Sequence, residues 1–277
     1  MNVSIVTVNF NNLEGFKRTH KSILSQSYTN WEWIVIDGGS TQGDREYIEQ
    51  HSSEMSYWCS EADKGPYNAM NKGIAVAKGQ YIIFLNSGDV FYDSEVLAHV
   101  FGKPHSTDVI YGDWIQWHDK EKKVLMNAPK KLSLRFIFSD NICHQAMFIK
   151  SDCLKQSPYD ESFTLYADWA KWITFAINGK TFEYVPYTIC LFQMGGMSNT
   201  RLELIEKEHQ RLQDEVIPIT VKEILAENDE LKAENNRLYH EKECVHPLAV
   251  EADKLIKEKN IYRKIIHMAI RIIHLIR

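Results

Sequence analysis

The first hundred residues alternate short apolar runs, rich in β-branched side chains, with segments of helical periodicity. Consecutive parallel strands need a crossover connection that is usually a helix, so this order predicts a mainly parallel sheet covered by helices on both faces. The fold class is therefore α/β. The expected strands are residues 3–8, 33–36, 57–59 and 81–85, and the expected helices are residues 13–24, 45–51, 67–77 and 95–101.

A polar, turn-forming segment follows each of these four strands, at residues 9–12, 37–40, 60–65 and 86–89. In a parallel sheet, ligands bind at the carboxyl ends of the strands, where the loops of neighbouring strands meet. The four segments therefore predict a single site along one edge of the sheet.

The pattern after residue 108 is strand-like with shorter connections. The sequence predicts strands at residues 109–112, 123–126, 146–149 and 183–192, and a turn followed by an aromatic helix at residues 160–178. We expect residues 1–200 to form one domain.

Composition narrows the class of protein. With 277 residues, 44% of them hydrophobic, the chain can bury one large core and carry an appendage. A net charge of −5 gives no global reason to expect nucleic acid as a partner. The five cysteines are scattered and lack a CxxC pair, which disfavours a disulfide framework and a structural zinc site. Since the sequence also shows no signal-peptide pattern and no apolar run of about 18 residues, we expect a cytoplasmic protein, either soluble or on a membrane surface.

Glycine is absent after Arg201, and charged residues at helical spacing dominate. We divide this appendage into a linking helix at 201–218, a coiled-coil segment at 219–245 and a basic amphipathic helix at 248–277. Asparagine at heptad a positions favours a parallel, in-register homodimer, whereas the alternative is a helix packed on its own domain. The a positions are Val221, Asn228 and Asn235, and the d positions are Ile224, Leu231 and Leu238.

Residues 261–277 place isoleucines on one side of a helix and basic side chains such as Arg263 and Arg271 on the other. A helix of this kind can lie in the headgroup region of an anionic bilayer, and a dimer would bind through two copies. The alternative is a helix folded back on the core.

Asp89 stands after the apolar strand 81–85, preceded by Gly88 in a turn. One carboxylate there can bind a hard divalent cation whose other ligands are diphosphate oxygens and water. The same pattern alone also describes a simple turn. Asp37, at the end of another central strand, favours the binding site.

Five motifs in the first hundred residues resemble those of family 2 glycosyltransferases with the nucleotide-sugar-binding GT-A fold, of the bacterial polysaccharide or O-antigen type. They occur in the family's order and cover nearly the whole region, which is far more specific than any single motif. The motifs are SIVTVNFN at 4–11, SILSQSY at 22–28, WIVIDGGST at 33–41, DKGPYNAMNKG at 63–73 and FLNSGD at 84–89.

The resemblance implies a donor site for a nucleotide sugar, normally with uracil as the base. A carboxylate accepts from a ring N–H, so Asp37 would hydrogen-bond the base. The helix after Gly65 would present polar side chains to the ribose, diphosphate or sugar, and the alternative is a solvated helix face. The implied donor-binding residues are Thr7, Asn9, Asp37, Asn68, Asn71, Lys72 and Ser87.

The family usually carries an Asp-x-Asp pattern after this strand, whereas Asn86 and Gly88 stand here beside Asp89. The resemblance implies dependence on Mn²⁺ or Mg²⁺, with Asp89 as the single protein carboxylate. The nucleotide diphosphate would then supply most of the other ligands.

A sugar hydroxyl is a poor nucleophile until a positioned group takes its proton. In the family this group is a carboxylate at the start of a helix, and residues 159–169 resemble that pattern with Asp168 as the base. Asp160 and Glu161 are alternatives, and Asp168 could also serve as a helix cap. His144 and Gln145 resemble a short family element and are expected to contact the diphosphate or the acceptor, the alternative for His144 being a structural role.

These residues together imply an inverting transfer of a sugar from a nucleoside-diphosphate sugar, a UDP-sugar, to a hydroxyl of a glycan acceptor. A lipid-linked acceptor in cell-surface polysaccharide biosynthesis fits the family and the basic C-terminal helix. The alternative function is a non-catalytic, nucleotide-binding scaffold, which the reduced metal motif favours and the intact Asp168 opposes.

Overall fold

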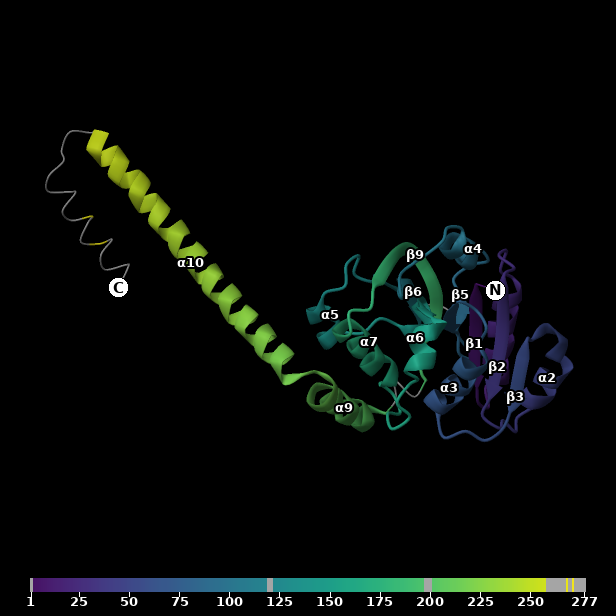
Figure 1. Cartoon of the computed structure of the whole chain (residues 1–277). Coiled ribbons are helices and arrows are strands. Elements are labelled where there is room, and N and C mark those ends of the chain that lie inside the picture. The colour runs from purple at the N-terminus through teal and green to yellow at the C-terminus, as the bar shows by residue number, and fades with distance from the viewer. Residues whose placement is uncertain (1, 119–121, 197–200, 258–267, 269–270, 272–277) are drawn as a thin grey trace. The chain divides into compact units, whose positions relative to one another are not determined.

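The structure is a computed structural model that describes residues 2–118, 122–196, 201–257, 268 and 271 (Figure 1). The chain divides into two compact units, Met1–Ile217 and Pro218–Arg277. The first unit contains the sheet with its helices, and the second contains one long helix.

Four strands form a parallel group in the order β3, β2, β1, β4. Nearly every side chain of β1 and β2 is buried, as expected of parallel strands that are covered on both faces. The strands and helices predicted for the first hundred residues are confirmed to within a few residues. They are β1 (Val3–Asn9), α1 (Leu13–Leu24), β2 (Trp31–Asp37), α2 (Asp44–Gln50), β3 (Tyr57–Ser60), α3 (Pro66–Val76), β4 (Tyr81–Phe84) and α4 (Val96–Phe101), with a 3₁₀ turn η1 at Ser52–Glu54.

Helix α1 shows how the sequence sets these boundaries. The Asn12 side chain caps its start by accepting the Gly15 N–H at 3.2 Å, which satisfies one of the free donors of the first turn. Phe16, Thr19 and Ile23 follow at helical spacing, so they lie on one face of the helix, and all three are buried.

The remaining strands make the sheet mixed, so the prediction of a mainly parallel sheet is wrong. Strand β8 pairs antiparallel with both β4 and β6, β9 pairs parallel with β6, and β5 and β7 pair antiparallel with β9 and β6. The few residues between β6 and β7 can join only antiparallel neighbours, whereas the direction of β8 is set by its contacts with β4 and β6, which are distant in the sequence. The strands are β5 (Val90–Phe91), β6 (Val109–Trp117), β7 (Lys123–Met126), β8 (Met147–Lys150) and β9 (Phe182–Gln193).

The sheet curls around the turn that joins β4 to β5. Strands β8, β6 and β9 lie between these two in the hydrogen-bonded order, so a flat sheet would separate them by roughly 19 Å. The connecting turn is compact, because the Asp89 N–H bonds the Asn86 carbonyl at 2.9 Å. The far end of the sheet therefore folds back toward β4, and the turn lies inside the curl.

Six further helical segments follow among the described residues in the second half of this unit. They are α5 (Leu134–Ser139), η2 (His144–Ala146), α6 (Ser151–Gln156), α7 (Ala167–Ile177), α9 (Leu202–Arg211) and the π-helical turn η3 (Leu212–Val216). Trp33, Phe84 and Phe148 are among the largest fully buried side chains and belong to β2, β4 and β8, so the core runs along the sheet.

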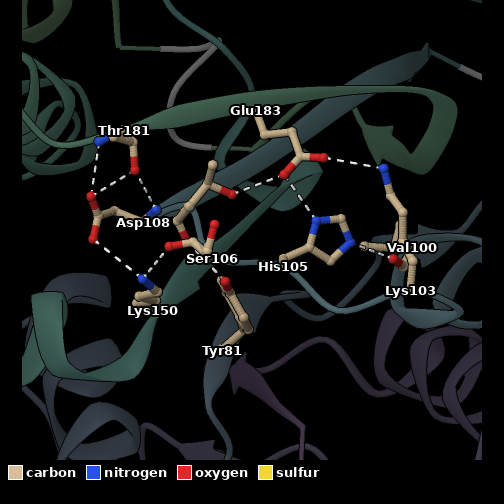
Figure 2. A network of polar contacts seen from close by, with 10 residues as sticks. Tyr81, Val100, Lys103, His105, Ser106, Asp108, Lys150, Thr181 and Glu183 are labelled. Atoms are coloured by element: carbon tan, nitrogen blue, oxygen red, sulfur yellow. Dashed lines mark hydrogen bonds and ion pairs between the residues drawn. The ribbon is translucent and has the colours of Figure 1, made fainter.

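A polar network closes the end of the sheet at which β6 and β9 begin (Figure 2). Glu183 accepts hydrogen bonds from His105 Nδ1 at 2.9 Å, Thr107 Oγ1 at 3.0 Å and Lys103 Nζ at 3.3 Å. Beside it, Thr181 donates its N–H and hydroxyl to the Asp108 carboxylate at 2.9 and 2.8 Å. The network ties the starts of both strands together.

The second unit contains α10 (Ile219–Lys257), a helix of 39 residues. Ile224, Leu231 and Leu238 recur every seven residues along it and are exposed by 59%, 53% and 50%. The coiled coil stays a prediction.

Residues 261–277, on which the amphipathic helix was predicted, lie outside the described residues except Met268 and Arg271. Within the described ranges, no helix combines the length and the apolar character that a membrane crossing requires.

Candidate active site

A pocket of about 660 Å³ lies inside the curl of the sheet, where β4, β6 and β9 end. Its wall combines the turn after β4, the segment around η2, the start of α7 and the end of β9. Five predicted site residues meet in this pocket, although they are far apart in the sequence. They are Ser87, Asp89, His144, Gln145 and Asp168.

Asp89 is only 4% exposed, yet it lines the pocket. Gly88 before it has φ 109°, and a Cβ there would lie 2.6 Å from the Gln193 side-chain oxygen, so the turn requires glycine. Asp89 Oδ2 accepts from Gln145 Nε2 and Oδ1 from the Gln193 backbone N–H, both at 2.8 Å. Burial raises the pKa of Asp89 to about 6, although these hydrogen bonds counteract part of the effect.

Gln145 is fixed at both ends of its amide. The NH₂ group donates to Asp89, and the amide oxygen accepts from the Cys143 thiol at 2.9 Å. Gln145 is 2% exposed, so it supports the Asp89 carboxylate from the protein side of the pocket.

Asp168 lies in the first turn of α7 and is 5% exposed. Its Oδ1 is 2.8 Å from the Tyr67 hydroxyl, and its Oδ2 is 3.1 Å from His144 Nδ1. Burial acts to raise the pKa of Asp168, but the hydrogen bond and charge of His144, with the Tyr67 hydrogen bond, outweigh it and lower the pKa. The carboxylate is therefore ionised and can accept a proton.

His144 connects Asp168 to the turn after β4. Its Nε2 is 3.3 Å from Asn86 Nδ2, while Nδ1 faces the Asp168 carboxylate. Nδ1 therefore donates to the Asp168 carboxylate, and Nε2 lies against the Asn86 side-chain amide. The Asn86 side-chain oxygen is buried and has no hydrogen-bond partner among the described residues.

Tyr67 belongs to the motif at residues 63–73, and the sequence does not predict its contact with Asp168. Its hydroxyl lies 2.6 Å from the Leu165 carbonyl and 2.8 Å from Asp168 Oδ1, so a single proton serves two acceptors. Burial and the Asp168 charge raise the pKa of Tyr67 well above its usual value. Tyr67 therefore remains a donor to the carboxylate.

Three predicted donor-binding residues lie deep in the sheet. Thr7 accepts from Trp33 Nε1 at 2.9 Å, and Asn9 donates to Asp37 Oδ1 at 2.7 Å. Asp37 also accepts from the hydroxyls of Ser40 and Ser60 at 2.5 and 2.6 Å. Burial acts to raise the pKa of Asp37, but these hydrogen bonds lower it overall. The three residues are outside the pocket lining, and recognition of the base by Asp37 stays a prediction.

The predicted residues on α3 hold neighbouring segments. Asn68 and Asn71 each donate to the Glu161 carboxylate at 2.9 Å, and Lys72 pairs with Glu61 at 2.7 Å. The two asparagines tie α3 to the segment that leads into α7, and Lys72 ties it to the loop after β3. Ser87, by contrast, lines the pocket, and its hydroxyl donates to the carbonyl of Asn12 at 3.1 Å.

Asp89 and Asn86, in the turn after β4, carry oxygen atoms of the kind that bind a divalent cation. No cluster of three or more His, Cys, Asp or Glu side chains suited to a metal occurs among the described residues. Each Asp89 oxygen accepts one hydrogen bond and keeps a further lone pair, and the buried Asn86 oxygen is unpartnered. Carboxylate and amide oxygens suit Mg²⁺ or Mn²⁺ when phosphate and water complete the shell, so the residues fit the predicted single-carboxylate site.

Comparisons with known proteins show to which family and relatives the chain is similar. The family model of Glycosyl transferase family 2 matches residues 4–155. An uncharacterized glycosyltransferase of Mycobacterium tuberculosis is 36% identical over 171 residues, which cover 60% of this chain and 65% of the relative, less than two thirds of its length. A PGL/p-HBAD biosynthesis glycosyltransferase of Mycobacterium bovis is 29% identical over 196 residues, covering 68% of this chain and 74% of the relative.

Two solved structures share the fold. S. aureus TarS 1-349 in complex with UDP-GlcNAc aligns with a TM-score of 0.58 at 16% identity, over 71% of this chain and 59% of that chain. The mannosyltransferase PcManGT from Pyrobaculum calidifontis, in complex with GDP-Man and Mn²⁺, aligns with a TM-score of 0.57 at 15% identity, over 81% and 68%. At these identities the likeness supports the fold alone, which is of the expected α/β GT-A type but has a curled, mixed sheet in place of the expected mainly parallel one.

Proposed function

Because this chain belongs to glycosyl transferase family 2, we propose that it transfers a sugar, with inversion, from a UDP-sugar to a hydroxyl of a glycan acceptor. The observation that carries the proposal is the buried, ionised Asp168 in the same pocket as Asp89. A single displacement needs one base on the acceptor side and a bound diphosphate on the other, and the two carboxylates would serve these separate tasks.

In the proposed reaction, Asp168 takes the proton of the acceptor hydroxyl as that oxygen attacks the anomeric carbon. The hydrogen bonds from Tyr67 and His144 orient the carboxylate and keep it ionised before the reaction. The anomeric bond to the diphosphate breaks on the opposite face, so the configuration inverts.

Asp89 and Asn86 would hold the divalent cation, which when bound neutralises charge on the departing diphosphate. Gln145 and the Gln193 N–H keep the Asp89 carboxylate in place throughout. With a pKa of about 6, this carboxylate is mostly ionised at neutral pH and loses its charge in mild acid.

The donor and the acceptor are proposals that rest on the relatives. TarS was solved with UDP-GlcNAc and PcManGT with GDP-Man, which supports a nucleotide-sugar donor. The Mycobacterium bovis relative is named for PGL/p-HBAD biosynthesis, which supports a biosynthetic role, and we propose that the product is a cell-surface glycan of the polysaccharide or O-antigen kind. We propose a lipid-linked acceptor and a cytoplasmic enzyme that contacts the inner face of the plasma membrane through the basic C-terminal sequence.

We also propose that α10 forms a parallel homodimer. Its exposed Ile224, Leu231 and Leu238 recur at heptad spacing, and Asn228 and Asn235 at a positions would pair in register. Sedimentation of the full chain should give a dimer, and the chain ending at Pro218 should sediment as a monomer. A dimer after truncation would contradict this assignment.

The function is tested by measuring binding and transfer with UDP-, GDP- and other nucleotide sugars, with and without Mn²⁺. We expect metal-dependent binding of a UDP-sugar and release of UDP when a polyprenyl-diphosphate-linked glycan is supplied. Metal-dependent binding without any transfer would favour a nucleotide-binding scaffold, and a response to GDP-sugars alone would overturn the proposed donor.

A further inference from the structure

The loop that precedes α7 is held by a buried carboxylate from a distant helix. Glu208 of α9 is 5% exposed, and it accepts the backbone N–H groups of three consecutive loop residues. The distances are 2.6 Å from Thr164, 2.8 Å from Leu165 and 3.1 Å from Tyr166. All three bonds need an acceptor, which is the role of an ionised carboxylate.

Other residues of α9 also contact the segment 162–169. The Arg211 guanidinium lies 3.9 Å from the centre of the Phe163 ring and donates to the Ser162 carbonyl and hydroxyl at 3.2 and 2.9 Å. The rings of His209 and Trp169 are 5.4 Å apart. Contacts from α9 therefore extend over residues 162–169, on both sides of Asp168.

The loop held by Glu208 forms part of the pocket wall. Thr164, Leu165 and Tyr166 all line the pocket, and α7 begins directly after them. The Leu165 carbonyl accepts the Tyr67 hydroxyl that also donates to Asp168. Any movement of the Leu165 peptide therefore changes how the Tyr67 proton is divided between the two acceptors.

From these contacts we propose that Glu208 is a positioning residue for the base Asp168. The inference rests on the proposed function, because it assigns Glu208 a role in the same transfer. Residues 157–166 form no regular helix or strand, so their backbone donors have no ladder of their own. Glu208 supplies the missing acceptors, and it thereby fixes the position of the peptide that orients Tyr67 and the start of α7.

The test is Glu208→Gln, with Glu206→Gln as the matched control. Glu206 is exposed on the same helix, so its variant loses the same charge outside the loop contact. In Glu208→Gln, one amide oxygen replaces two carboxylate oxygens, and the new NH₂ group faces at least one backbone N–H. We expect kcat to fall by about 10- to 100-fold with the dissociation constant of UDP-Mn²⁺ changed less than about twofold.

Two further measurements separate positioning from a general loss of structure. Amide hydrogen exchange at Thr164, Leu165 and Tyr166 should quicken in Glu208→Gln and not in Glu206→Gln. The acidic limb of the pH dependence of kcat should also move, because the Tyr67 hydrogen bond to Asp168 changes. A kcat equal to that of the control, or an equal loss of kcat and nucleotide affinity, would overturn the proposal.

The same experiment with Asp168→Asn distinguishes failure of this inference from failure of the proposed function. If Asp168→Asn keeps transfer, the proposed base is wrong. If Asp168→Asn abolishes transfer while Glu208→Gln behaves like its control, only the positioning role is refuted.

Discussion

Two histidine–carboxylate pairs lie at opposite ends of the same strands and differ in what surrounds them. His105 pairs with Glu183 where β6 and β9 begin, as Figure 2 shows, and His144 pairs with Asp168 in the pocket where these strands end. The His105 side chain is 1% exposed and that of His144 is 15% exposed. Both pairs look alike in the sequence, since each joins residues far apart in the chain.

The hydrogen bonds around the two rings show that His105–Glu183 is a structural pair, whereas His144–Asp168 can take part in the reaction. His105 faces two acceptors, Glu183 at 2.9 Å and the Val100 carbonyl at 2.6 Å, so both ring nitrogens must donate. His144 faces a carboxylate and an amide donor, and its partner Asp168 opens on a pocket. The buried His105 pair, away from the pocket, stabilises the fold, whereas the ionised Asp168 carboxylate borders the pocket and can take a proton from a substrate.

Replacing His144 with alanine should have the largest effect of the variants that separate the two pairs. Asp168 would lose a donor that orients it and lowers its pKa, and we expect kcat to fall by about 100-fold. The free energy of unfolding should change by no more than about 1 kcal/mol, since water from the pocket can replace the ring. Steady-state kinetics and urea unfolding measure the two effects, and a stable variant with native kcat would make His144 structural.

His105→Ala should show the reverse pattern. It leaves the buried Val100 carbonyl without its donor and removes one partner of Glu183, so we expect a loss of about 2–3 kcal/mol in the free energy of unfolding. Urea denaturation gives this value. The kcat of the folded variant should stay within about twofold of native. A large loss of kcat would show that the His105–Glu183 pair also contributes to the reaction.

Tyr67→Phe tests the second donor to Asp168. The hydroxyl stabilises the ionised carboxylate, so its removal raises the pKa of Asp168, and the acidic limb of kcat should move to higher pH. We expect a loss of kcat of several fold at neutral pH, measured over a pH series. A limb that does not move would show that Tyr67 leaves its proton with the Leu165 carbonyl.

Binding of UDP with Mn²⁺ should weaken as the pH falls below about 6. Burial raises the pKa of Asp89 to about 6, and the carboxylate binds a cation only when it is ionised. Calorimetric titration between pH 5 and 8 measures this change. Asp89→Ala gives the nucleotide's own pH dependence for comparison. Identical pH profiles in the two proteins would exclude Asp89 as the metal ligand.

Local pattern was enough to predict the first half of the fold. Helix α1 begins at Leu13 and ends at Leu24, as its helical spacing predicts, and β1 and β4 follow from buried apolar runs. The mixed character of the sheet was missed because β8 and β9 find their partners through contacts that no local pattern records. Periodicity predicts a strand, but it does not say which neighbour the strand will take or in which direction.

The site likewise contains residues that a local pattern predicts and residues that only non-local contacts bring together. Asp89 and Asp168 were predicted from motifs, because the turn after a strand and the start of a helix are local features. Tyr67 and Glu208 were not, since Tyr67 meets Asp168 across 101 positions and Glu208 meets Thr164 across 44. A buried glutamate on a charged helix has the sequence pattern of a solvated face, so only the folded loop shows what it binds.

The most direct test is the transfer rate of Asp168→Asn, measured beside its affinity for UDP and Mn²⁺. Asparagine keeps the size of the side chain but cannot take the proton of the acceptor hydroxyl. We expect transfer to fall by about 10²- to 10⁴-fold while nucleotide affinity stays within about twofold of native. Transfer at the native rate would contradict the assignment of Asp168 as the base.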